Sequence, residues 1–340
     1  MSTYFFATVT YGLEAVLADE IKELGIEVRG IKYERGKIIF QAFGEAARLM
    51  RLRCADNVYR IIAEFEVGPH KSDLIQIEIG MKKLNWERLA FEYSRSREIC
   101  VSASRRGKHA FSRFDMITTI ENALARNGFT RAGKDTEGAM CIRADLDGTC
   151  CRISIKLTDA AFRFRGNDRT FLKGGIRPTV AAVLVRISQP SKNDVCYDPF
   201  CGSGTIPDER AHLPARRILA SDIDEGAVMV AEVNCRDSVV VFHADARKTP
   251  SQSESVDIII SNPPWNKQIA VGDVRALYAE FMAEAARILK PHGRIVLLTD
   301  CHEEITAAST ENGLRLYERH SLSLHGLHPK VYELRKEISS

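Results

Sequence analysis

The chain has 340 residues, of which 45% are hydrophobic and 27% charged, and its formal net charge is +3. This composition indicates a soluble globular protein of two or three domains, and the mild positive charge permits a nucleic-acid partner without requiring one. The apolar windows are far shorter than the ~20 residues of a membrane-spanning helix, and the first residues lack the pattern of a signal peptide. Nine cysteines without a C-x-x-C pair predict reduced thiols in the cytoplasm, and the histidines lack metal-ligand spacing.

The first 65 residues predict a strand, a helix, two strands, a short helix and a fourth strand. This order is typical of a ferredoxin-like fold. The next hundred residues predict a mainly helical stretch over 74–93, a strand over 98–105 and a helix that Gly128 caps. Two strands then flank the hairpin dipeptide Asp147-Gly148.

A glycine-rich, basic segment over 162–177 reads as a linker, and Pro178 begins the helix that follows it. Five apolar strands then alternate with helices, which predicts an open parallel sheet. Their sequences are DVCYDPF, RILASDID, VVVFHAD, VDIIISN and RIVLLTD. The last two strand candidates, LRLYERHSLSL and KVYELRK, predict a closing antiparallel hairpin.

These patterns divide the chain into four parts. They are a ferredoxin-like subdomain over 1–65, a second α/β unit over 66–165, a linker with its helix over 166–190, and a ligand-binding α/β domain over 191–340.

Glycines and carboxylates follow the first three strands of the predicted sheet, where ligands of such sheets bind. The glycines of DPFCGSGT let backbone N–H groups approach a ligand, but no Gly-Lys-Ser/Thr follows, so the loop does not predict phosphate binding. Asp222 is placed to accept ribose hydroxyls, and Asp245 either accepts an adenine amino group or caps the next helix. Asp224 is a candidate surface neighbour. Ribose and adenine contacts without a phosphate site predict S-adenosylmethionine as the ligand.

The fourth strand ends abruptly at Asn262-Pro263-Pro264-Trp265. Two prolines exclude both a helix and a central strand, so this turn is rigid and extended. A carboxamide and an aromatic ring on such a turn favour binding of a flat group. The alternative is a turn whose Trp265 fills the core.

The motifs DPFCGSGT, SDID, HAD and SNPPW, in this order, resemble those of class I S-adenosylmethionine-dependent methyltransferases that act on planar amines. The stretches FFATVTYGLEAVLADEI, VSASRRGKHAF and FRFRGNDRTFLKGGIRPTVAA resemble a ferredoxin-like subdomain followed by a THUMP RNA-binding domain. The resemblance covers nearly the whole chain and is strongest to THUMP-containing tRNA guanine-N2-methyltransferases of the acceptor stem. Two positions depart from many relatives: Trp265-Asn266 replaces Tyr or Phe with Gly, and Asn262 replaces the Asp of some guanine-N2 enzymes.

The resemblance implies a Rossmann-like methyltransferase sheet with an antiparallel last strand, preceded by a ferredoxin-like α+β subdomain and a THUMP α/β domain. It implies methyl transfer from S-adenosylmethionine to guanine N2 of tRNA at position 6 of the acceptor stem, with S-adenosylhomocysteine as product. Asn262 also occurs in adenine-N6 and protein-glutamine enzymes, so other acceptors stay open. They are position 10 of tRNA, ribosomal RNA and adenine N6 of RNA or DNA, and a non-catalytic RNA-binding protein is a further alternative.

Three groups of residues are predicted to act in this function. The catalytic group is Asn262, Pro263 and Trp265, which would hold the amine and stack on the base. The cofactor group is Asp198, Phe200, Gly202, Gly204, Thr205, Asp222, Ile223, Asp245, Ala246 and Asn262. The RNA-binding group is Arg105, Arg106, Lys108, Arg165, Arg169 and Lys173. The expected partner is the acceptor stem and 3′ end of tRNA, bound by a monomer that uses no metal and no membrane.

Overall fold

The structure is a computed structural model, and it describes residues 3–44, 46–94, 96–133, 136–159, 161–265, 272–323 and 326–337. The chain forms two compact units. The first comprises Met1–Thr8, Ile21–Leu52 and Asn57–Phe162, and the second comprises Val9–Glu20, Arg53–Asp56 and Arg163–Ser340.

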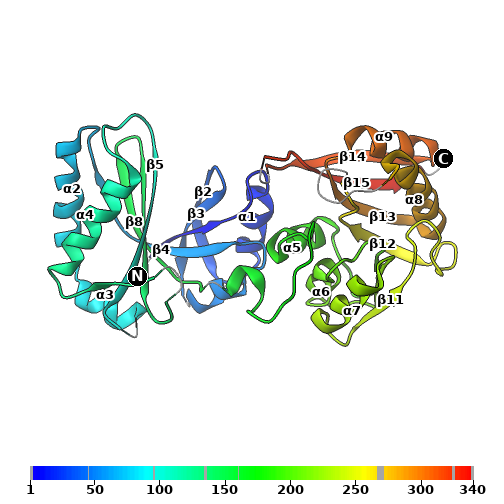
Figure 1. Ribbon diagram of the computed structural model, residues 1–340, viewed down its shortest axis with the longest axis horizontal. Helices are drawn as coiled ribbons and strands as arrows, with labels where there is room; N and C mark the ends of the chain where they lie inside the picture. The colour runs from blue at the N-terminus through cyan, green and yellow to red at the C-terminus, as the bar shows by residue number, and fades with distance from the viewer. Residues whose placement is uncertain are drawn as a thin grey trace. The chain divides into compact units, whose positions relative to one another are not determined.

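The first unit is built on a sheet of eight strands in the order β2-β3-β1-β4-β8-β7-β5-β6 (Figure 1). The strands are β1 (Thr3–Thr8), β2 (Glu27–Glu34), β3 (Lys37–Phe43), β4 (Asn57–Glu66), β5 (Glu98–Arg106), β6 (Thr130–Arg131), β7 (Met140–Asp147) and β8 (Cys150–Lys156). The antiparallel run of β2, β3, β1 and β4 has the strand order of the predicted ferredoxin-like fold. The first predicted helix is α1 (Glu14–Lys22), most of which belongs to the second unit, and the second predicted helix is the 3₁₀ turn η1 (Ala46–Arg51).

Strand β4 also pairs with β8, so one sheet continues across the domain boundary predicted at residue 65. Three helices cover one face of the far half of this sheet, namely α2 (Ile75–Lys82), α3 (Trp86–Tyr93) and α4 (Arg113–Ala125), with the 3₁₀ turn η2 (Lys71–Leu74) before α2. Their apolar faces meet the sheet in a core that includes Ile77, Met116, Ile120, Leu124, Ile142 and Ile153. The left-handed backbone of Gly128, with φ of 76°, ends α4 as predicted.

The second unit contains a sheet of seven strands in the order β11-β10-β9-β12-β13-β15-β14. The strands are β9 (Val195–Asp198), β10 (Arg217–Asp222), β11 (Val239–His243), β12 (Val256–Ser261), β13 (Leu289–Thr299), β14 (Leu314–Ser321) and β15 (Lys330–Lys336). The first five are parallel, and β15 is antiparallel to both β13 and β14, which confirms the predicted hairpin at the end of the sheet. Strand order reverses between β9 and β12, and this switch point locates the expected ligand site.

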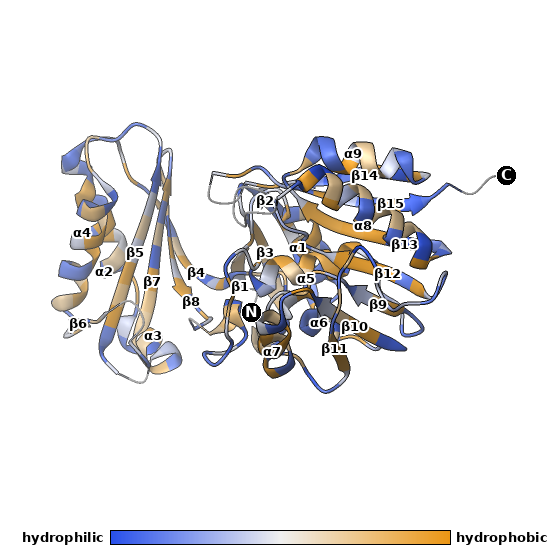
Figure 2. Cartoon of the chain, turned by 45° about the vertical axis from the view of Figure 1, so that its right-hand side comes forward, coloured by the Kyte–Doolittle hydropathy of each residue, from blue (hydrophilic) through white to orange (hydrophobic). Residues whose placement is uncertain are grey.

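Helices lie on both faces of this sheet (Figure 1). They are α5 (Pro178–Ile187), α6 (Thr205–Arg210), α7 (Glu225–Asn234), α8 (Val274–Ile288) and α9 (His302–Glu311), and the 3₁₀ turn η3 is Phe162–Phe164. Figure 2 shows strands such as β7 and β13 largely in hydrophobic colour, as expected for strands whose side chains are buried. Among the described residues, no helix is both long and apolar enough to span a membrane.

Candidate active site

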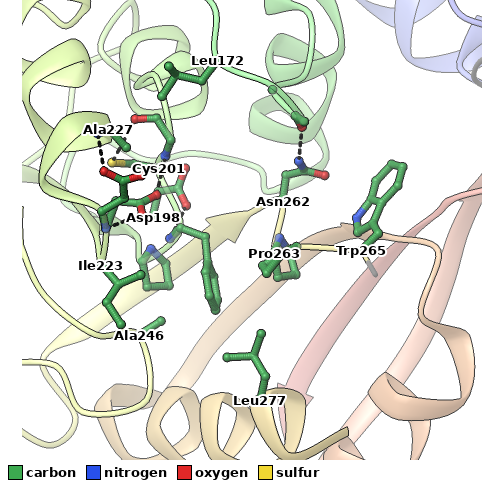
Figure 3. Close-up of a pocket in the computed structure, with 18 of the residues that line it drawn as sticks. Leu172, Asp198, Cys201, Ile223, Ala227, Ala246, Asn262, Pro263, Trp265 and Leu277 are labelled. Atoms are coloured by element: carbon green, nitrogen blue, oxygen red, sulfur yellow. Dashed lines mark hydrogen bonds between the residues drawn. The ribbon is translucent and has the colours of Figure 1, made fainter. Parts of the chain in front are cut away.

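A cavity of about 910 Å³ opens where β9, β10, β11 and β12 end, at the switch point of the sheet (Figure 3). Its walls come from the turns after these four strands and from the start of α8. The segment Leu172–Ile176, which precedes the sheet in sequence, forms a further wall. The sequence motifs that follow the four strands therefore meet in one place.

The glycine loop after β9 adopts a conformation that favours glycine at two positions. Gly202 has φ of 51° and Gly204 has φ of 77°, both in the left-handed region. A Cβ atom at Gly204 would lie 2.5 Å from Sγ of Cys235, so the loop packs closely against the end of α7. The loop leads into α6 at the buried Thr205, and the ring of Phe200 stands edge-on to Phe281 with centroids 4.9 Å apart.

Asp198 is a buried carboxylate at the end of β9. Its Oδ1 accepts hydrogen bonds from Ser261 Oγ at 2.6 Å and from the Phe200 N–H at 3.1 Å. Its Oδ2 is buried and has no hydrogen-bond partner among the described residues. Burial raises the pKa of Asp198 to about 7, and the nearby charge of Asp222 acts in the same direction. An unpaired buried oxygen of this kind is suited to receive a donor from a ligand.

Asp222 links the second strand end to the glycine loop. Its Oδ2 accepts the Gly202 N–H at 2.9 Å, and its Oδ1 accepts the Asp224 N–H at 3.1 Å. Ile223 lines the cavity and is 59% exposed, so an apolar side chain is available to a ligand there.

The helix cap considered for Asp245 is formed by Asp224 instead, which is exposed as expected. Asp224 is the N-cap of α7, where its Oδ1 accepts the N–H groups of Gly226 and Ala227. Asp245 caps no helix: its carboxylate is held by Arg247, whose Nη2 donates at 2.7 Å. These hydrogen bonds from Arg247 lower the pKa of Asp245, so the carboxylate is kept ionised beside the buried Ala246.

Asn262 lines the cavity and has one unpaired acceptor. Its Nδ2 donates to the carbonyl oxygen of Gly174 at 3.4 Å, whereas its Oδ1 is buried without a partner among the described residues (Figure 3). Pro263 and Pro264 follow and also line the cavity. The rigid turn predicted from the sequence therefore holds the carboxamide with its oxygen unpaired.

Trp265 differs from the expectation of an open aromatic face. The side chain lines the cavity but is only 5% exposed, and its indole N–H donates to the Leu298 carbonyl at 3.2 Å. Figure 3 shows the ring on the opposite side of Asn262 from Asp198. A large indole gains most from burial when its N–H also finds an acceptor, and this arrangement satisfies both conditions. Asn266, the other departure from the family pattern, lies outside the described residues.

The six cations predicted to bind RNA fall into two classes. Arg105, Arg106 and Lys108 are exposed at the end of β5. Arg165 and Arg169 are instead mostly buried, because Arg165 pairs with Glu209 and Arg169 with Asp208, each at 2.8 Å. The RNA contact of these two arginines stays a prediction, and in this structure their guanidinium groups are paired with carboxylates of α6. Lys173 is exposed but lines the cavity.

Several residues of the cavity were not predicted from the sequence. The sequence of Leu172–Ile176 has the pattern of a linker, and no sequence motif marks Arg247 or Leu277 of α8. The available signal was the pair Gly174-Gly175 next to Ile176, because glycines allow close approach to a ligand. Without periodicity or a strand end nearby, that signal did not distinguish a cavity wall from a flexible connection.

The cavity suits S-adenosylmethionine. The unpaired Oδ2 of Asp198 can accept from an ammonium group, and the Gly202 and Gly204 turn leaves room for a ligand close to the backbone. Asp222 stands where ribose hydroxyls need an acceptor, and the exposed Ile223 offers an apolar face to adenine. These residues would hold the cofactor.

Two domain families match the chain. Residues 165–330 match the RMKL-like methyltransferase domain, and residues 4–59 match the RlmL ferredoxin-like domain. A tRNA (guanine(6)-N2)-methyltransferase of Thermus thermophilus is 28% identical over 341 residues, which cover 97% of this chain and 98% of that protein. An enzyme of the same name from Archaeoglobus fulgidus is 24% identical over 375 residues, which cover 96% of this chain and 91% of that protein.

Solved structures agree with this assignment. The crystal structure of TrmN from Thermus thermophilus superposes with a TM-score of 0.84 at 25% identity, and covers 98% of this chain and 100% of that one. SMU.472, a putative methyltransferase complexed with S-adenosylhomocysteine, has the same fold, with a TM-score of 0.75 at 19% identity over 100% of this chain and 99% of that one. The chain is therefore an S-adenosylmethionine-dependent methyltransferase with the class I fold, and it is similar to the RlmL ferredoxin-like domain over residues 4–59 and to the RMKL-like methyltransferase domain over residues 165–330.

Proposed function

We propose that the protein transfers a methyl group from S-adenosylmethionine to the exocyclic N2 of a guanosine in tRNA, at position 6 of the acceptor stem. The observation that carries this proposal is the buried, unpaired Oδ1 of Asn262 on a proline-rigid turn beside the cofactor cavity. The names of the relatives that match over nearly their full length support the choice of guanine N2 and of tRNA.

The chain's part in the reaction is to position a weak nucleophile. An exocyclic amine donates its lone pair into the base, so it must be turned before it can attack. Asn262 Oδ1 and the Pro263 carbonyl would each accept one N–H of the amine, which directs the lone pair into the cavity. The bound cofactor supplies an already activated methyl group on a sulfonium. Alignment therefore provides most of the rate enhancement, and the amine needs no strong base before attack.

Access to the amine requires the base to leave its helix. Unstacking one nucleotide costs a few kcal/mol, which contacts in the cavity must offset. Because Trp265 is buried, stacking on its ring would require the side chain to become more exposed than it is here. Stacking of the base on Trp265 is therefore proposed together with a movement of this side chain.

Binding of the RNA would fall to the first unit. The segment 66–165 is proposed to be a THUMP domain that holds the 3′ end of tRNA and sets the distance to the target. The exposed Arg105, Arg106 and Lys108 at the end of β5 are its candidate phosphate contacts. On this proposal the protein acts as a monomer in the cytoplasm, where tRNA is modified.

The test is a methyl-transfer assay on purified protein with labelled S-adenosylmethionine. Unmodified tRNA, ribosomal RNA and DNA are incubated separately and digested to nucleosides. Label in N2-methylguanosine from tRNA, lost when adenosine replaces the guanosine at position 6, is the expected result. Label that persists after this replacement moves the target to another tRNA position, and label only from ribosomal RNA changes the substrate. Label in N6-methyladenine refutes the guanine assignment, and RNA binding without any label supports a non-catalytic role.

A further inference from the structure

Asn234, the last residue of α7, connects three parts of the active-site region through one side chain. Its Oδ1 accepts the Thr170 N–H at 3.2 Å, and its Nδ2 donates to the Thr170 carbonyl at 2.8 Å. The same Nδ2 donates to the Ser203 carbonyl at 2.8 Å, which lies in the glycine loop. The carboxamide therefore joins the segment before the cavity wall to the loop that surrounds the cofactor site.

The wall itself begins two residues beyond this contact. Arg169 fixes the chain just before it, through a buried ion pair with Asp208 of α6 at 2.8 Å. Leu172–Ile176 then line the cavity, with a turn closed by the Gly175 N–H and the Leu172 carbonyl at 3.1 Å. A Cβ atom at Gly175 would lie 3.0 Å from that carbonyl oxygen, so a side chain at this position would crowd the turn.

This wall determines which end of the Asn262 carboxamide is left without a partner. The Gly174 carbonyl can only accept a hydrogen bond, so it selects the Nδ2 end of Asn262. The Oδ1 end is then left buried and without a partner among the described residues, and on the proposed function the substrate amine would donate to it. A wall displaced by a fraction of an ångström would no longer hold the carboxamide at its 3.4 Å contact.

We propose that Asn234 is a positioning residue for methyl transfer: it holds residues 170–175 against the glycine loop so that Gly174 orients Asn262. This inference rests on the proposed function only in assigning Asn262 as the acceptor of the amine. Asn234 is absent from the cavity lining, so it acts on the reaction through other residues.

The first test compares Asn234→Ala with Glu232→Gln, an exposed control on the same helix. Both are assayed well below their unfolding midpoints. Asn234→Ala is expected to lower kcat about tenfold while S-adenosylhomocysteine affinity changes by no more than about threefold, because a small misplacement affects alignment more than binding. A residue with a purely structural role would lower the midpoint and leave kcat unchanged, and that result would overturn the proposal.

The second test asks whether Asn234 acts through Asn262. In an Asn262→Asp background the side chain has no N–H for the Gly174 carbonyl, so adding Asn234→Ala is expected to lower kcat by less than about twofold. An equal loss in both backgrounds refutes the link. If Asn262→Asp is too slow to assay, the proposal is decided by the first test, in which Asn234→Ala lowers kcat but not S-adenosylhomocysteine affinity.

A third measurement does not need RNA. The Thr170 N–H donates a hydrogen bond to Asn234 Oδ1, so its hydrogen exchange is expected to accelerate at least about tenfold in Asn234→Ala. Unchanged exchange would show that Asn234 does not hold residues 170–175 in place. If wild-type protein methylates no tRNA, the proposed function fails, but this measurement still tests whether Asn234 holds residues 170–175 in place.

Discussion

Two side-chain oxygens in the cavity, Asp198 Oδ2 and Asn262 Oδ1, are buried and accept no hydrogen bond from the described residues. Buried acceptors are normally paired, since an unpaired one costs about 1–3 kcal/mol. Both lie at turns that neighbouring residues hold in place, so neither can relax toward a partner within the protein. On the proposed function, hydrogen bonds donated by the cofactor and by the substrate amine would offset this cost.

Replacement of Asn262 by Ala is expected to lower kcat by at least about 100-fold, because one of the two acceptors of the amine is lost. S-adenosylhomocysteine affinity should change by no more than about threefold, since the proposed ribose and adenine contacts remain. Single-turnover methyl transfer and calorimetry measure the two quantities. Asn312→Ala is the matched control, because the Asn312 side chain donates a hydrogen bond to the Ala308 carbonyl in α9 and does not line the cavity. Full turnover of Asn262→Ala contradicts the mechanism.

Asp198 should make cofactor binding depend on pH. Burial raises its pKa from 3.8 to about 7, so the carboxylate is costly in the folded protein without ligand. Stability of the free protein should therefore fall as pH rises from 3.8 to about 7, and then level off. An ammonium ligand favours the charged form, so the Kd for S-adenosylhomocysteine should be about tenfold weaker at about pH 6 than at about pH 8. Titration calorimetry of Asp198→Asn should show weaker binding of S-adenosylhomocysteine at both pH values, with no change of Kd between them. If the Kd of this variant still changes with pH, Asp198 is not the cause of the pH dependence.

At the scale of elements, the glycine loop offers a matched pair of substitutions. Gly202 and Gly204 both have positive φ, so alanine at either is strained by about 1 kcal/mol. Only Gly204 has a close neighbour, because its added Cβ would lie 2.5 Å from Cys235 Sγ, whereas Gly202 has open space. Gly204→Ala should therefore lose about 1–3 kcal/mol more stability in urea unfolding than Gly202→Ala. Equal losses would show that the loop moves away from α7 at little cost.

Helix α6 carries two buried carboxylates that fix the preceding segment. Arg169→Ala leaves Asp208 without its buried partner and should reduce the free energy of unfolding by about 3 kcal/mol. Arg236→Ala is the control, because Arg236 reaches the same carboxylate at 3.4 Å from a half-exposed position and contributes about 0–1 kcal/mol. The salt dependence of RNA binding should be unchanged in both variants. A change in that dependence for Arg169→Ala would support its predicted RNA contact.

At the scale of the whole molecule, the basic surface of the first unit should be tested by its response to salt. Lys108→Ala should reduce the slope of log K against log salt for tRNA by about 0.7–0.9, the value for one phosphate contact. Lys192→Ala removes an equally exposed lysine in the second unit and should leave the slope unchanged. Filter binding at several salt concentrations measures both. Equal slopes for wild type and Lys108→Ala would exclude this lysine as a phosphate contact.

The sequence by itself determined the alternation of strands and helices in the second sheet and the motifs at its edge. Apolar runs of strand length, each ended by Asp198, Asp222, Asp245 or Asn262, indicate parallel strands whose carboxyl ends meet. The reason is local, since alternation of strands and helices restricts the chain to few topologies, and those topologies bring the strand ends together. The glycine turn, the proline-rigid turn and the final hairpin are equally local, because each depends on residues adjacent in sequence.

Only the tertiary structure decided which polar side chains are free. Arg165 and Arg169 lie in a basic, glycine-rich segment that resembles a surface linker. In the structure they are mostly buried and form ion pairs with carboxylates about 40 residues away in sequence. The pairing of β4 with β8 joins residues about 90 apart into one sheet, and no pattern within either strand reports it. The local sequence pattern predicts the polarity and the conformation of each segment. Whether a charge, an indole ring or a strand edge is buried depends instead on residues that are distant in sequence and that folding brings into contact with it.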